Sequence, residues 1–93
     1  MSFVQKDPLV GEVELIGARL KQARVGANLS LQDISNRTRI SLRFLTAIEN
    51  DDFAALPGRV YIIGFTTAFA RAVGLDEKSL LTALREKMPL VAD

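Results

Sequence analysis

Six positively charged side chains between residues 15 and 45 form the densest concentration of potentially functional groups in this chain. A single carboxylate, Asp33, accompanies them, although the whole chain of 93 residues has a net charge of only +1. Cations at this density can neutralise nucleic-acid phosphates, giving salt-sensitive binding that tolerates many sequences. They can equally form the solvated surface of a soluble domain. The six residues are Arg19, Lys21, Arg24, Arg37, Arg39 and Arg43.

A second candidate site lies between residues 59 and 73, where apolar residues exceed what one helix needs for packing. Ile62, Phe69 and Val73 recur at helical spacing, with Thr66 between them. This spacing predicts one stripe that faces the core. The remaining apolar residues are therefore available for a protein partner.

Tyr61 and Phe65 form an aromatic pair beside that stripe, four residues apart. Ala68 and Ala72 continue the line and would leave both rings above a shallow surface, as interface anchors often are. Burial inside the bundle is an equal alternative for Phe65, whereas the hydroxyl of Tyr61 favours an edge. Gly64 indicates close approach of another backbone, either from the bundle itself or from a partner.

Composition argues against catalysis. The chain has no histidine and no cysteine, which excludes disulfides, nearly all transition-metal sites and the commonest general base. The sequence shows neither a nucleophile paired with a base nor a glycine loop for phosphate. We therefore expect a protein that is not an enzyme and that has no metal and no cofactor.

Length and hydropathy indicate one small soluble domain. A hydrophobic content of 48% and a charged content of 25% are ordinary for a globular protein. A secretory signal pattern is missing, and no apolar run approaches the ~18 residues of a membrane span. We expect a cytoplasmic chain.

Hydrophobic spacing predicts an all-α, compact five-helix bundle, with helices at about residues 14–27, 31–38, 42–50, 59–73 and 77–88. We expect residues 1–13 to be a flexible arm, 14–88 the domain and 89–93 a tail. Local signals support these limits. Asn28 and Gly74 suit helix ends, and Ser30, Ser41 and Asp76 suit helix starts.

The second and third predicted helices, joined by a tight turn, form a helix-turn-helix. Its second helix offers few base-reading groups, namely Ser41, Arg43, Thr46 and Asn50, while Leu42 and Ala47 are expected on the same face and could only touch a thymine methyl. Arg39 stands at the turn, where glycine often eases a left-handed conformation.

Several segments resemble the cytoplasmic domains of the RodZ family, which belongs to the Cro/repressor-like helix-turn-helix superfamily. The resemblance covers about residues 16–88. Its most specific part is residues 56–65, LPGRVYIIGF, followed by FAR at 69–71 and GLD at 74–76. The resemblance implies binding to the actin-like filament protein MreB through two fourth-helix aromatics, which fall on Tyr61 and Phe65.

Members of this family normally continue through a basic segment, one transmembrane helix and a periplasmic domain. The 93 residues contain none of these, so we expect an excised piece of a longer protein at the cytoplasmic face of the inner membrane, with a natural stand-alone protein as the alternative. Attachment to the membrane rests on the resemblance alone.

Two functional hypotheses follow. In the first, the domain is a cytoskeletal adaptor that docks through Tyr61 and Phe65, with Arg71 at the rim. In the second, it is a transcription regulator that reads bases with Ser41, Arg43 and Thr46. The phosphate contacts would then come from Arg24, Arg37 and Arg39.

Overall fold

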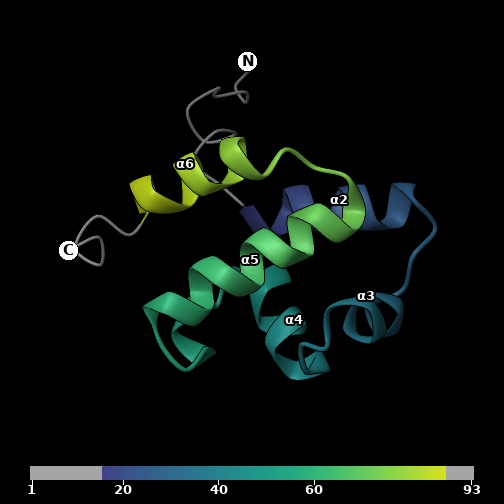
Figure 1. Cartoon of the computed structure of the whole chain (residues 1–93), viewed down its shortest axis with the longest axis horizontal. Coiled ribbons are helices and arrows are strands. Elements are labelled where there is room, and N and C mark those ends of the chain that lie inside the picture. Colours follow the sequence, from purple (N-terminus) through teal and green to yellow (C-terminus); the bar gives the residue numbers. More distant parts are fainter. Residues whose placement is uncertain (1–15, 88–93) are drawn as a thin grey trace, which may run out of the picture.

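Helix α5, Arg59–Val73, runs through the middle of the structure and packs against all four other helices (Figure 1). The computed structural model describes residues 16–87, so the expected arm and tail lie outside it. The other elements are α2 (Ile16–Gly26), α3 (Leu31–Thr38), α4 (Leu42–Glu49), a 3₁₀ turn at Phe53–Ala55 and α6 (Glu77–Lys87). The expected all-α five-helix bundle is confirmed for the described residues.

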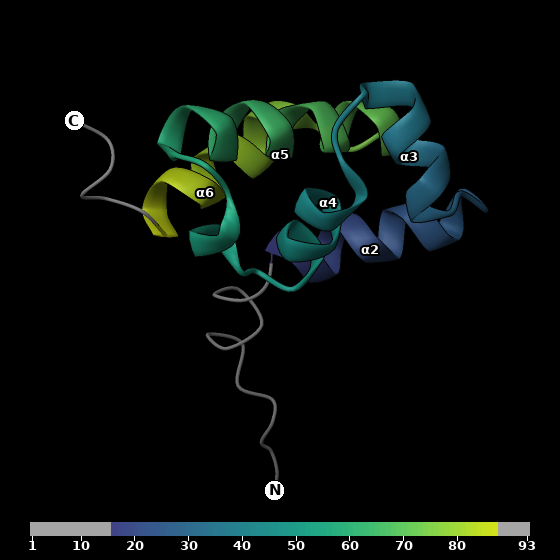
Figure 2. The ribbon, with the colours of Figure 1, turned by 90° about the horizontal axis from the view of Figure 1, so that it is seen from below.

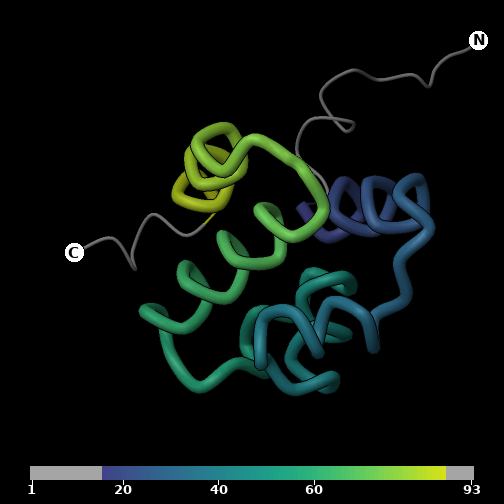
Figure 3. Tube along the Cα trace, turned by 45° about the vertical axis from the view of Figure 1, so that its right-hand side comes forward, coloured from purple at the N-terminus to yellow at the C-terminus, as the bar shows by residue number. Residues whose placement is uncertain are grey.

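The helix-turn-helix, α3 and α4, lies on one side of α5, and α6 lies on the other (Figure 3). Helix α2 closes the bundle by packing against α4, α5 and α6 (Figure 2). Every helix therefore contributes to a common core. Its largest fully buried side chains are Leu20, Ile34, Leu45, Ile48, Thr66, Phe69, Leu80 and Leu84.

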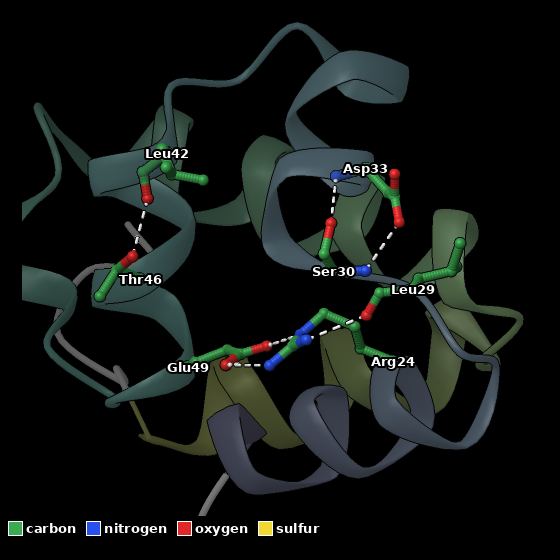
Figure 4. Close-up of polar contacts among 7 residues, drawn as sticks. All are labelled: Arg24, Leu29, Ser30, Asp33, Leu42, Thr46 and Glu49. Carbon is green, nitrogen blue, oxygen red and sulfur yellow. Dashed lines mark hydrogen bonds and ion pairs between the residues drawn. The ribbon is translucent and has the colours of Figure 1, made fainter.

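Local signals account for the limits of α3. Ser30 accepts a hydrogen bond from the Asp33 backbone N–H, and the Asp33 carboxylate accepts one from the Ser30 backbone N–H (Figure 4). This reciprocal pair is a capping box, which satisfies backbone donors at the helix start. At the other end Arg39 has a left-handed conformation with φ of 65°, as expected at the turn.

Other predicted limits also agree with the structure. Asn28 has a φ of 63° after α2, and Gly74 is left-handed with φ of 80° after α5. The Asp76 carboxylate accepts a hydrogen bond from the Lys78 backbone N–H at the start of α6. The residues at these three helix limits thus adopt the conformations or hydrogen bonds that their types predict.

Ser41 is a correction to the expected capping. It occupies the position before α4 with extended backbone, but its side chain makes no capping hydrogen bond to the described residues. Helix α4 therefore depends more on packing of Leu45 and Ile48, both fully buried, than on its start.

Gly64 was expected to mark a close backbone approach, and the bundle does not provide one. A Cβ built on Gly64 meets no atom of the described residues within 4 Å. The close approach instead occurs at Gly17, where an added Cβ would collide with the backbone carbonyls of Ile48 and Glu49. Glycine at residue 17 allows α2 to lie directly against α4.

Candidate protein-docking and nucleic-acid surfaces

The outer face of α5 is apolar and exposed. Val60 is 75% exposed and Tyr61 is 49% exposed, and both belong to the small group of large hydrophobic residues on the described surface. The opposite face of the helix carries Ile62, Thr66 and Phe69, which are buried as the predicted stripe requires. Helix α5 is therefore hydrophobic on two faces, only one of which contacts the core.

Phe65 lies between the core and this outer face. Its ring is half-buried and lies 5.5 Å from the ring of Tyr61 and 5.7 Å from that of Phe44 on α4, measured between centroids. Phe65 is therefore both a core residue and a surface residue, because part of its ring packs inward while another part borders the exposed ring of Tyr61. Arg43 extends the row, with its guanidinium carbon 5.2 Å from the Phe44 centroid.

Phe44 and Val60 are the residues of this surface that sequence reasoning did not select. Phe44 comes from α4, so its contact with Phe65 depends on how α4 and α5 pack. A signal for Val60 did exist, because it follows the helix start next to Tyr61 and lies outside the core stripe of Ile62 and Phe69.

Arg71 lies near the far end of α5 and is exposed. Its Nε donates to Glu77 Oε2 at 2.8 Å and its Nη2 donates to Oε1 at 3.0 Å. These hydrogen bonds raise the pKa of Arg71 and lower the pKa of Glu77. Because the pair is open to solvent, it contributes little to stability and can exchange partners.

The face of α4 expected to read bases is sparsely equipped. Ser41, Arg43 and Thr46 are exposed, but the Thr46 hydroxyl donates to the Leu42 carbonyl at 2.9 Å within the helix (Figure 4). Leu42 is 41% exposed, as expected on this face. Ala47 was expected there too and is instead buried against the core.

The six cations separate into different environments. Arg37 and Arg39 are exposed beside the turn, where a phosphate could reach them. Arg24 is only 13% exposed, and its guanidinium holds Glu49 through bonds of 2.5 and 3.1 Å and the Leu29 carbonyl through one of 3.0 Å (Figure 4).

The pairing with Glu49 raises the pKa of Arg24, so its guanidinium stays charged. A buried arginine with its donors engaged in this way stabilises the contact between α2 and α4. This placement argues against the phosphate contact expected of Arg24.

Residues 16–87 contain no group of three or more carboxylate, histidine or cysteine side chains arranged to hold a metal ion. Within the same range, every helix is too short or too polar to cross a bilayer. The surfaces that remain as candidates are the outer face of α5 and the exposed side of the helix-turn-helix.

Comparison with known proteins places this chain among helix-turn-helix domains. A family described as a helix-turn-helix domain matches residues 19–80. The cytoskeleton protein RodZ of Streptococcus pneumoniae is 41% identical over 68 residues, which are 73% of this chain and 25% of that protein. The uncharacterized membrane protein YmfM of Bacillus subtilis is 36% identical over 61 residues, which are 66% of this chain and 21% of that protein. The chain thus spans about a quarter of these relatives.

A solved structure shares the architecture. YmfM from Staphylococcus aureus, described as a candidate DNA-binding membrane protein, superposes with a TM-score of 0.74 at 30% identity. The match covers 80% of this chain and 90% of that one.

Proposed function

The chain belongs to the helix-turn-helix domain family in its RodZ-like form, and on that premise we propose that it is a non-enzymatic adaptor for an actin-like filament protein of the MreB type. The single observation that carries the proposal is the exposed aromatic Tyr61, whose ring lies tilted beside that of Phe65 on a face of α5 that no described residue covers. Large aromatics of this kind are the usual anchors of protein interfaces.

Two features support a protein partner in preference to solvent alone. A surface helix normally turns its polar residues to solvent, yet the outer face of α5 carries Val60 at 75% exposure. In addition, the relative with the higher identity is named a cytoskeleton protein. The adaptor is proposed to act at the cytoplasmic face of the inner membrane, within a longer protein that carries the anchor.

The test is co-sedimentation of the domain with purified MreB filaments. Tyr61→Ala should weaken binding by about tenfold or more, the usual effect of removing an interface anchor. Tyr61 is half exposed, so the domain should retain its helical content by circular dichroism. The double variant with Phe65→Ala should lose binding altogether, with some loss of stability because Phe65 is half-buried.

Val25→Ala is the matched control, because Val25 is also an exposed apolar residue, at 56%, but belongs to a different helix, α2. It should bind like the parent chain. Binding of the Tyr61→Ala variant as tight as that of the parent chain would contradict the docking role of this face. Absence of filament binding by the parent chain would overturn the proposed adaptor function.

DNA binding is a second candidate function, favoured by the exposure of Arg37, Arg39 and Arg43 around the helix-turn-helix and by the description of the Staphylococcus aureus structure. A duplex titration at low and physiological salt, run beside the filament assay, separates the two functions. Binding confined to low salt and indifferent to sequence would show attraction to phosphates only.

A further inference from the structure

The centre of the outer face of α5 is Gly64. Glycine is among the poorest helix formers, and Gly64 lies in the middle of a helix of 15 residues. Nothing in the described structure requires it, because a Cβ at this position would meet no atom within 4 Å and the backbone is an ordinary helix. The open space above Gly64 faces outward.

Gly64 also lies in a four-residue hole. Tyr61, Gly64, Phe65 and Ala68 occupy positions i, i+3, i+4 and i+7, the diamond into which a side chain from a facing helix inserts. The two aromatic rings lie together on one side of this diamond, with centroids 5.5 Å apart. Gly64 and Ala68 form a low floor beside them.

The wall of the hole is supported from below. Phe44 on α4 contacts the ring of Phe65 at 5.7 Å between centroids, and Phe65 also packs against the buried core. The ring of Phe65 is thus already held by packing before a partner binds, which keeps the ordering cost of docking low.

We propose that this hole receives one large aliphatic side chain from a helix of the filament partner, with Gly64 as its floor. The proposal rests on the proposed adaptor function and adds the point of contact. Glycine lets two helix backbones approach closely, so the partner side chain reaches the rings of Tyr61 and Phe65 and the helix axis of the partner crosses α5 near Gly64.

The area of the face favours a filament over a second copy of this chain. The 15 residues of α5 span about 22 Å at about 1.5 Å per residue, and one helix face is about 10 Å wide. The resulting strip of roughly 200 Å² falls well below the roughly 800 Å² per partner of a stable complex. A filament repeats its docking site along its length, so membrane-bound copies can bind together and compensate for a small contact.

Charge around the hole further defines the partner. Helix α5 carries Arg59 and Arg71 and no carboxylate, and among the described residues Arg71 pairs with the partly exposed Glu77. A carboxylate on the partner can replace Glu77 at little cost. The expected partner surface therefore has a large aliphatic residue with an acidic residue about one to two helical turns away.

The decisive experiment fills the hole. Gly64→Leu should weaken co-sedimentation with MreB filaments by about tenfold or more, as blocking of a central interface pocket does. Gly64→Ala should weaken binding less, because a methyl group fills only part of the hole. Both variants should melt at or above the temperature of the parent chain, because both residues are better helix formers than glycine.

Gly26→Leu is the matched control. Gly26 is also helical and exposed, and a Cβ there also meets no described atom within 4 Å, but it lies at the end of α2. This variant should bind filaments like the parent chain. Equal losses in both leucine variants would indicate a general effect of added apolar surface and would overturn the proposal.

Other outcomes separate the hole from the adaptor function. If Tyr61→Ala abolishes binding while Gly64→Leu leaves it intact, the proposed insertion at Gly64 is wrong and the proposed adaptor function is retained. If the parent chain does not bind filaments, both the insertion at Gly64 and the adaptor function are wrong. If analytical ultracentrifugation shows a dimer that Gly64→Leu dissociates, the hole belongs to a second copy of the chain and the assignment to a filament is overturned.

Discussion

The arginines between residues 15 and 45 differ in burial and in bonding partners, and Arg24 is the clearest case. The side chains of Arg24 and Glu49 are 13% and 7% exposed, and the guanidinium donates two hydrogen bonds to the carboxylate. By contrast, Arg37 is exposed on α3. One arginine therefore holds helices together, while the other remains available at the surface.

Arg24→Ala should lower the free energy of unfolding by roughly 3 kcal/mol, because it leaves the Glu49 carboxylate buried without its partner. Urea denaturation followed by circular dichroism measures the change. Arg37→Ala is the control and should change stability by less than about 0.5 kcal/mol, as exposed substitutions usually do. A loss of similar size in both variants would contradict the structural role of Arg24.

Any DNA-binding defect of Arg24→Ala must be judged against its effect on folding. Arg37, Arg39 and Arg43 are the better probes of phosphate and base contacts, because their side chains are exposed. Removing one phosphate contact reduces the salt slope of binding by about one.

Capping differs between the two helices of the helix-turn-helix. Helix α3 begins with a complete capping box at Ser30 and Asp33, whereas Ser41 before α4 makes no capping bond to the described residues. Two serines in equivalent positions therefore contribute differently to stability.

Ser30→Ala should destabilise the domain by about 1 kcal/mol at pH 7, the usual cost of a lost N-cap, and Ser41→Ala should cost clearly less. The change is measured as a shift in urea midpoint. Equal effects of the two substitutions would contradict the assignment of the cap.

The same box makes the effect of Ser30→Ala depend on pH. Hydrogen bonds from the Ser30 backbone N–H and hydroxyl lower the pKa of Asp33 in the folded state. The folded state therefore binds fewer protons than the unfolded chain near pH 4, and the stabilisation is complete above this range and lost as pH falls through the lowered pKa. Ser30→Ala removes only the hydroxyl's share of this pKa shift, because alanine keeps the backbone N–H. The stability difference between the parent chain and the variant should therefore shrink only modestly below about pH 4.

Asp51 connects parts of the molecule that are distant in sequence. Its Oδ1 accepts a hydrogen bond from the Gly17 backbone N–H at 2.6 Å, and its Oδ2 accepts one from Lys87 Nζ at 3.0 Å. The start of α2, the loop after α4 and the end of α6 thereby share one carboxylate. Asp51 holds this position with a φ of 57°, which aspartate and asparagine tolerate better than most residues.

Asp51→Ala should destabilise the whole domain by about 2 kcal/mol, because the Gly17 amide loses its acceptor and alanine is strained at positive φ. Hydrogen exchange at the Gly17 amide should accelerate together with the fall in urea midpoint. Lys87→Ala should cost under about 1 kcal/mol, because the Lys87 side chain is one-third exposed.

Asp51→Asn keeps an oxygen acceptor and the tolerance for positive φ, so it should behave like Lys87→Ala. A loss in Asp51→Asn as large as in Asp51→Ala would show that the charge, not the acceptor, holds the ends of the bundle.

The sequence by itself determined the helices and much of their ends. The limits of α3, the left-handed Arg39 and Gly74, and the core stripe of α5 all follow from residues within a few positions of one another. Turns and caps are local, because their hydrogen bonds join backbone groups three or four residues apart. The exposure of Tyr61 was predictable for a similar reason, since its position relative to the core stripe is set by helical spacing.

The tertiary structure alone decided which residues meet across the bundle. It joined Arg24 to Glu49 and Gly17 to Asp51, placed Phe44 against Phe65, and left Gly64 open while closing the space over Gly17. The two members of each pair come from different elements, so the periodicity of one helix carries no information about their contact. Their contacts depend on how the helices cross and how closely they approach, which follows from the packing of the whole core.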